Sequence, residues 1–96
     1  MDLGKFDAIE FEWDSGNLVE IERHRVNDWE CEECFFNDPE VYRNKRKQRQ
    51  YSTYRLMGRT DAGRKLSVIF FVRERQRTGV GRTTAFVRVI TARPLE

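Results

Sequence analysis

The sequence has no long apolar run, only one histidine and only two cysteines among its 96 residues. No stretch approaches the roughly 20 apolar residues that a membrane-spanning helix needs. The N-terminus also lacks the basic and then apolar pattern of a secretory signal. We therefore expect a cytoplasmic protein without a membrane partner. Its length predicts a single domain over residues 1–96.

The two cysteines, Cys31 and Cys34, have the spacing of a redox motif or of half a zinc site. A zinc site needs four ligands, and the sequence offers neither a second such pair nor enough histidines. Acidic neighbours raise the pKa of a thiol, which disfavours redox chemistry. We therefore favour two thiols packed as small apolar groups on one helix face, and we expect neither a metal nor a cofactor.

Charge is sorted along the chain. Residues 1–40 hold 13 acids and 3 bases, a net charge of −10, whereas residues 41–96 hold 3 acids and 15 bases, a net charge of +12. A basic half of this density is typical of proteins that bind a polyanion, because phosphate contacts supply most non-specific nucleic-acid affinity. The distribution predicts two layers, with an acidic helical back and a basic front on the sheet.

Hydrophobic periodicity predicts elements in the order β-α-α-β-β-β. Apolar and acidic residues alternate over residues 8–13, which predicts the first strand. Two helices follow; Asn27 and Glu30 have the spacing of a capping box at the start of the second, and Pro39 ends it. The last three strands are expected over residues 51–60, 65–73 and 84–92. The fold class is α+β, with two helices packed on one face of a four-stranded, mainly antiparallel sheet.

Two basic segments are expected to be loops between these elements. Residues 43–50 hold five bases and no apolar side chain, and residues 74–84 form the second segment. The first segment is either a solvated connection or a nucleic-acid contact, since flexible Lys/Arg runs follow phosphates well. The candidate RNA-binding residues are Lys45, Arg46, Lys47, Arg49, Arg75 and Arg82.

The last two strands are apolar on both faces, although a strand between helices and water should alternate more cleanly. The second face is therefore either covered by loops or docks a partner. Four arginines, Arg59, Arg73, Arg88 and Arg93, lie in or at the ends of the predicted strands. Such side chains can converge to bind phosphate and to stabilise charge developing on it, or they can each be strand-end solubilisers.

His24 is the only histidine and lies between two arginines. Flanking positive charge lowers the pKa of an imidazole, which suits a general base near neutral pH. The alternative is a helix-end residue that bonds the last carbonyls. The sequence leaves both interpretations open.

Taken together and in order, the motifs resemble the BrnT family of toxins. In the first half they are Phe11-Glu12-Trp13-Asp14, Gly16-Asn17, His24-Arg25-Val26 and the stretch from Glu30 to Pro39. In the second half they are Gly58-Arg59-Thr60, Gly63-Arg64, an apolar strand ending in Arg73, and Arg88-Val89-Ile90-Thr91-Ala92-Arg93. The resemblance covers residues 9–93.

The resemblance implies a RelE-like fold and a metal-independent endoribonuclease toxin of a type II toxin–antitoxin system. The implied partners are an RNA substrate, a cognate ribbon-helix-helix antitoxin and, through the antitoxin, promoter DNA. The implied reaction is attack of a 2′-hydroxyl on the adjacent phosphate, and alanine at Arg73 or Arg93 is expected to abolish it. The family's recurring residues match His24, Arg59, Arg73, Arg88 and Arg93. The alternative is a non-catalytic module that binds nucleic acid or a partner through the same basic face.

The sequence departs from the family pattern at several positions. Arg25 stands where a glycine commonly follows the histidine, and Thr53 and Phe71 replace an acidic residue and a threonine. Family members continue past Ala92 and Arg93 into a C-terminal helix, so the resemblance implies a domain that lacks this helix or is truncated before it. The second sheet face would then either be exposed or pair with another chain, and in the second case the protein is a dimer.

Overall fold

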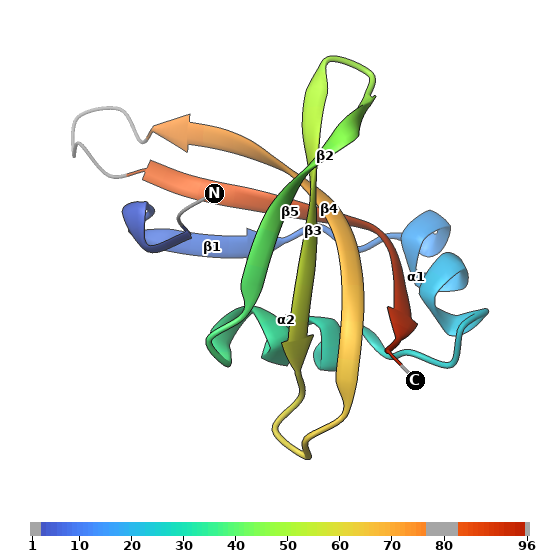
Figure 1. The fold of residues 1–96 in the computed structure, drawn as a ribbon. Helices are drawn as coiled ribbons and strands as arrows, with labels where there is room; N and C mark the ends of the chain where they lie inside the picture. The colour runs from blue at the N-terminus through green and yellow to red at the C-terminus, as the bar shows by residue number, and fades with distance from the viewer. Residues whose placement is uncertain (1–2, 77–82, 96) are drawn as a thin grey trace.

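The computed structural model describes residues 3–76 and 83–95 (Figure 1). In this part of the chain the structure contains a 3-10 turn (Leu3–Lys5), strands β1 (Ala8–Phe11), β2 (Glu40–Gln48), β3 (Tyr51–Arg59), β4 (Lys65–Gln76) and β5 (Thr83–Pro94), and helices α1 (Ser15–Glu22) and α2 (Asp28–Phe36). The strands form one sheet in the order β1-β5-β4-β3-β2. Only β1 pairs in parallel, with β5, and the other pairs are antiparallel.

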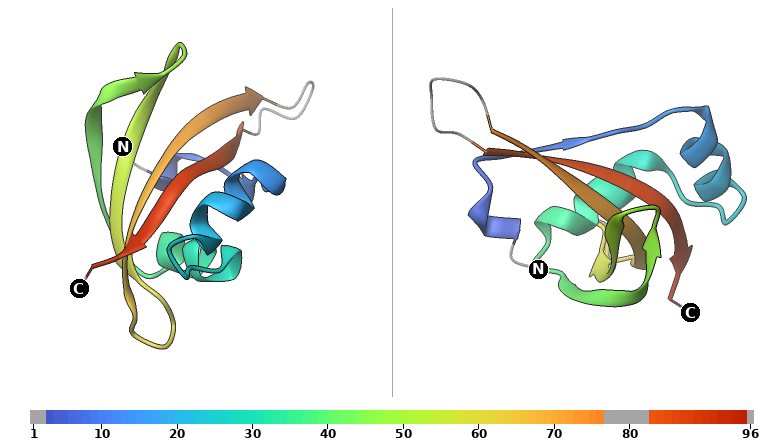
Figure 2. Two further views of the ribbon diagram at one scale, coloured as in Figure 1. Left: turned by 90° about the vertical axis from the view of Figure 1, so that its right-hand side faces the viewer. Right: turned by 90° about the horizontal axis from the view of Figure 1, so that it is seen from above.

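Both helices lie on one side of this sheet, and the other side is uncovered (Figures 1 and 2). The prediction of an α+β fold with two helices on one face of a mainly antiparallel sheet is therefore confirmed. None of the helices among the described residues is long and apolar enough to cross a bilayer.

The sheet has five strands where four were expected, because β2 forms where residues 43–50 were predicted to be a loop. The prediction was wrong because β2 is an edge strand: it pairs only with β3, and most of its side chains face water. An edge strand needs no apolar face, and Lys and Arg on it prevent pairing with other chains. A register shift between Arg43 and Lys47 also interrupts the regular alternation by which a strand is recognised in a sequence.

The hydrophobic core lies between the helices and the sheet. Alternate residues of β4 and β5 are fully buried there, among them Phe70 and Val87. The Phe70 ring packs edge-on against Phe35 of α2, with ring centroids 4.8 Å apart. Cys31 and Cys34 of α2 are also free and fully buried in this cluster, which confirms that the two thiols are packing residues.

The buried thiols should resist chemical labelling. Burial, followed by the charges of neighbouring groups, raises the pKa of Cys31 to about 12 and that of Cys34 to about 11. Because only the thiolate is a good nucleophile, we expect iodoacetamide to leave the native protein unmodified at mildly alkaline pH and to label both thiols after denaturation. Labelling of the native protein at the rate of a small-molecule thiol, followed by mass spectrometry, would contradict this packing.

Asn17 connects α1 to the sheet by hydrogen bonds near the end of β1. Asp14 caps the helix by accepting from the Gly16 backbone N–H at 2.9 Å, and Asn17 Oδ1 accepts in return from the Asp14 backbone N–H at 2.9 Å. The Asn17 Nδ2 group donates to the carbonyl oxygens of Glu12 and Val89 at 2.8 and 3.1 Å. The segment from Glu12 to Asp14 is therefore held against β5.

The start of α2 follows the sequence prediction. Glu30 Oε1 accepts from the Asn27 backbone N–H at 3.0 Å, which is the return bond expected of a capping box. Arg64 Nη1 contacts both oxygens of the buried Glu30 carboxylate, at 2.9 and 3.0 Å. Gly63 has a φ of +90° in the turn, a conformation that favours glycine.

Candidate functional site

The four strand arginines lie on the uncovered face of the sheet. Successive strand residues point to opposite faces, so Arg73 lies on the face opposite the buried Phe70. Arg88 pairs with Phe71 in the register between β4 and β5, which places it on the same face as Arg73. The same alternation places Arg59 and Arg93 there, each one residue from a core position.

These arginines form two separate groups. Arg88 lies opposite Phe71, two residues from Arg73 along β4, whereas Arg93 lies opposite Ser67 and Arg59 opposite Lys65. Ser67 and Arg73 are six positions apart along β4, which is about 20 Å at a rise of roughly 3.3 Å per residue. The structure therefore brings Arg73 and Arg88 together and places Arg59 and Arg93 near the other end of the sheet.

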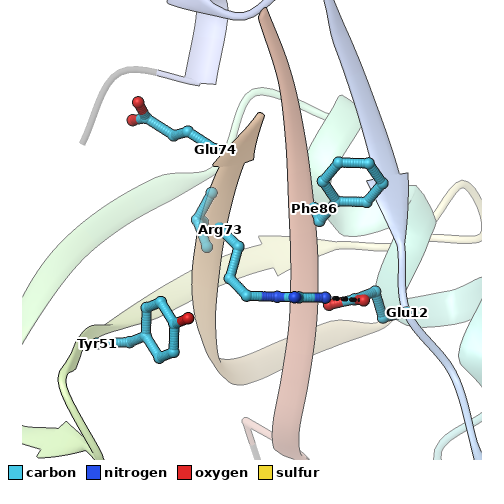
Figure 3. A pocket seen from close by; sticks show the side chains of 6 residues that line it. Glu12, Tyr51, Arg73, Glu74 and Phe86 are labelled. Atoms are coloured by element: carbon cyan, nitrogen blue, oxygen red, sulfur yellow. Dashed lines mark hydrogen bonds and ion pairs between the residues drawn. The ribbon is translucent and has the colours of Figure 1, made fainter. Parts of the chain in front are cut away.

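An open groove lies at the Arg73 end, and we call it the arginine groove. Its lining includes Glu12, Arg49, Tyr51, Phe71, Arg73 and Arg88. A neighbouring hollow shares Glu12, Tyr51 and Arg73 with it, and there the Arg73 side chain extends between Tyr51 and Glu12 (Figure 3). The groove is thus assembled from the end of β1, the β2–β3 turn and the two longest strands.

Two carboxylates from the segment between β1 and α1 contact these arginines. Arg73 Nη2 donates to Glu12 Oε2, and Arg88 Nη1 lies 2.9 Å from Asp14 Oδ2. The hydrogen bond from Arg88, followed by that from the Asn17 backbone N–H, holds the pKa of Asp14 below its ordinary value. Both pairs are partly solvated, with the Arg73 side chain 44% exposed and that of Asp14 55% exposed.

This arrangement corrects the prediction of an acidic back and a basic front. Alternation along β1 directs Ile9 and Phe11 toward the core, so Glu12 lies on the uncovered face with the arginines. The prediction of an acidic helical back placed the acids of the first strand with the helices, so Glu12 and Asp14 were not expected in the site. The alternation of residues 8–13 already held the signal for Glu12.

One oxygen of Glu12 is buried without a hydrogen-bond partner among the described residues. This atom is Oε1, while Oε2 accepts from Arg73. Buried polar atoms are normally hydrogen-bonded, so an exception calls for an explanation. Glu12 lines the arginine groove, and this oxygen, which is buried in the free protein, would reach a bound ligand only after the Glu12 side chain reorients.

An aromatic pair forms one wall of the groove. The ring of Tyr51 stacks on that of Phe71, with centroids 5.1 Å apart and planes 18° apart. Phe71 is thereby largely buried, while Tyr51 remains half-buried. The groove therefore combines two guanidinium groups, a carboxylate and a planar aromatic surface on which a nucleobase can stack.

His24 does not share this groove with the arginines. It lies in the turn after α1, and its Nε2 is 3.2 Å from Glu20 Oε2. The same oxygen accepts from Thr91 Oγ1 at 2.9 Å, and this bond is the main reason that the pKa of Glu20 is lowered. The structure thus shows the His24 side chain bonded to a carboxylate, and not to the last helix carbonyls.

The basic residues of β2 lead away from the groove. Lys45, Arg46 and Lys47 are exposed on β2, and Arg49 in the following turn lines the groove itself. The β2–β3 turn projects from the body of the domain at the top of Figure 1. Of the other two predicted RNA contacts, Arg75 belongs to β4 but its side chain is outside the described part of the chain, and Arg82 lies outside the described residues.

Among the residues that the structure describes, no group of three or more His, Cys, Asp or Glu side chains is placed to hold a metal ion. In comparisons with known proteins, neither a protein family nor a curated protein matches the sequence.

Proposed function

We propose that the arginine groove binds a phosphate of RNA and that the protein is a metal-independent endoribonuclease toxin. The observation that carries this proposal is the meeting of Arg73 and Arg88, from neighbouring strands, in one open groove beside a carboxylate with a free oxygen. The chain's resemblance to BrnT toxins points the same way.

The two guanidinium groups would hold the phosphate. Each offers a planar fork of donors that matches two phosphate oxygens. Both are paired with carboxylates in the free protein, but exposed ion pairs are weak and screened by salt. A polyanion that brings several phosphates to the basic β2–β3 hairpin can therefore compete for these arginines.

Cleavage would proceed by attack of the ribose 2′-oxygen on the adjacent phosphorus, with loss of the 5′-oxygen of the next nucleotide. After its side chain reorients toward the bound RNA, Glu12 Oε1 would accept the proton of the 2′-hydroxyl, and water in the open groove would protonate the departing 5′-oxygen. Arg73 and Arg88 would stabilise the charge that builds up on the non-bridging oxygens. The products are a 2′,3′-cyclic phosphate and a 5′-hydroxyl. Glu12 here takes the proton-transfer role for which His24 was considered.

The wider biological setting follows from the resemblance and is part of the proposal. The RNA would run from the arginine groove along Lys45, Arg46, Lys47 and Arg49. A cognate ribbon-helix-helix antitoxin would neutralise the toxin in the cytoplasm and bind promoter DNA. A dimer through the uncovered sheet face also remains a prediction.

The proposal is tested by incubating the purified chain with a structured RNA in EDTA. Fragments that end in a 2′,3′-cyclic phosphate are expected, and an Arg73→Ala/Arg88→Ala double variant prepared in parallel should produce none, which controls for contaminating ribonuclease. A salt-sensitive gel shift without fragments would instead support the non-catalytic binding module.

A further inference from the structure

The solvent face of α2 carries two large aromatic side chains. Trp29 is 54% exposed and Phe36 is 65% exposed. They are seven residues apart, so they lie on one face of the helix, about 10 Å apart along its axis at 1.5 Å per residue. The opposite face of α2 is the buried one and includes Cys31 and Cys34. A surface helix normally places polar residues where Trp29 and Phe36 lie, and exposed apolar groups of this size mark interaction sites.

Carboxylates flank this aromatic pair on both sides. A rotation of 100° per residue places Glu32 on one side of the line from Trp29 to Phe36 and Glu33 on the other. Glu32 Oε2 accepts from Trp13 Nε1 at 2.8 Å, and Glu33 Oε1 accepts from the Asp61 backbone N–H at 2.9 Å. Both donors are neutral, so these hydrogen bonds orient the two carboxylates without pairing them with a positive charge.

We propose that this face of α2 is a docking site for a cationic amphipathic helix of a partner protein. Apolar side chains of that helix, spaced by one and two turns, would pack on Trp29 and Phe36. Lysines and arginines beside them would face Glu32 and Glu33. Carboxylates that are already oriented lose little freedom on binding, which favours affinity.

By charge alone, the basic half of a second copy of the chain could also dock on this face of α2. The side chains of that basic half, however, match the two exposed aromatics less well. The most basic segment of the chain, residues 43–50, contains no apolar side chain that could cover the two aromatics. A separate partner that combines apolar and basic residues fits both features of the site.

The site is independent of the proposed ribonuclease activity. Helix α2 lies on the core side of the sheet (Figure 2). The residues that line the arginine groove point to the uncovered side. A partner on α2 therefore leaves Arg73 and Arg88 accessible to RNA.

The test measures the fluorescence anisotropy of a labelled helical peptide with leucines at positions i, i+4 and i+7 and lysines on the flanking positions. The full chain is expected to bind it, and Trp29→Gln/Phe36→Gln is expected to weaken binding by at least about tenfold, because buried aromatic anchors dominate such interfaces. Glutamine is a good helix former, so the fold should survive these exposed substitutions. Val19→Gln, at another exposed apolar residue, is the matched control and should bind like the wild type.

Three outcomes would overturn the proposal. The first is equal binding of the lysine peptide by the wild type and by Trp29→Gln/Phe36→Gln while circular dichroism shows both to be folded. The second is equal binding of a peptide in which glutamates replace the lysines. The third is a wild-type dimer in sedimentation that dissociates on Trp29→Gln/Phe36→Gln substitution, because the occupant would then be a second copy.

Discussion

Alanine at Arg73 or Arg88 is expected to slow RNA cleavage by about 100- to 1,000-fold, the cost of losing one preorganised donor to transition-state charge. Alanine at Arg59 or Arg93 is expected to change the cleavage rate only a few-fold. The difference arises because the first two arginines line the groove, whereas Arg93 lies opposite Ser67, toward the other end of β4. The difference in cleavage rate is measured by single-turnover cleavage of one labelled RNA by the four variants.

The conservative variant Arg73→Lys provides the control for charge. Lysine keeps the positive charge but lacks the fork of donors, so we expect a rate between those of the wild type and Arg73→Ala. Thermal unfolding of each variant separates a lost phosphate contact from a lost fold, since removal of Arg73 also leaves Glu12 without its partner. If alanine at Arg73 and alanine at Arg93 slowed RNA cleavage equally, catalysis would not be confined to the arginine groove.

Phe70→Ala is expected to lower the free energy of unfolding by about 3–5 kcal/mol, the usual cost of removing a buried phenylalanine. Phe70 is fully buried, and its ring contacts those of Phe35 and Tyr54 at centroid distances of 4.8 and 5.7 Å. Its loss leaves a cavity where α2 meets β3 and β4. Urea denaturation, followed by circular dichroism, measures the change.

Phe36→Ala is the matched control for Phe70→Ala. The residue type is the same, but Phe36 is 65% exposed, and substitutions at exposed positions usually change stability by less than about 1 kcal/mol. If both variants lost the same stability, or if Phe70→Ala lost less, then α2 would not pack on the sheet as described.

Features that depend on neighbouring residues in the sequence could be predicted. The spacing of Asn27 and Glu30 gave the start of α2. Cys31 and Cys34 were expected to pack, because acids flank them and further metal ligands are lacking. These predictions rest on composition and on the local geometry of a few neighbouring residues, which tertiary contacts here did not override.

Features that depend on the order and register of strands could not be predicted in the same way. The edge strand β2 has no apolar face, so hydrophobic periodicity did not reveal it. The separation of Arg93 from Arg73 follows from the residues that pair across β4 and β5, and no local pattern encodes that register. The contact between Asp14 and Arg88 joins residues 74 positions apart, so it appears only when β1 pairs with β5.

The most direct test of the central claim locates RNA on the folded protein. A 2′-O-methylated RNA, which lacks the attacking hydroxyl and is not cleaved, is titrated into the chain while the arginine Nε–H signals are followed by NMR. We expect the signals of Arg73 and Arg88 to shift together at low RNA concentration, ahead of those of Arg59 and Arg93. This expectation would be contradicted by shifts confined to Arg59 and Arg93, or by RNA binding that leaves Arg73 and Arg88 unchanged.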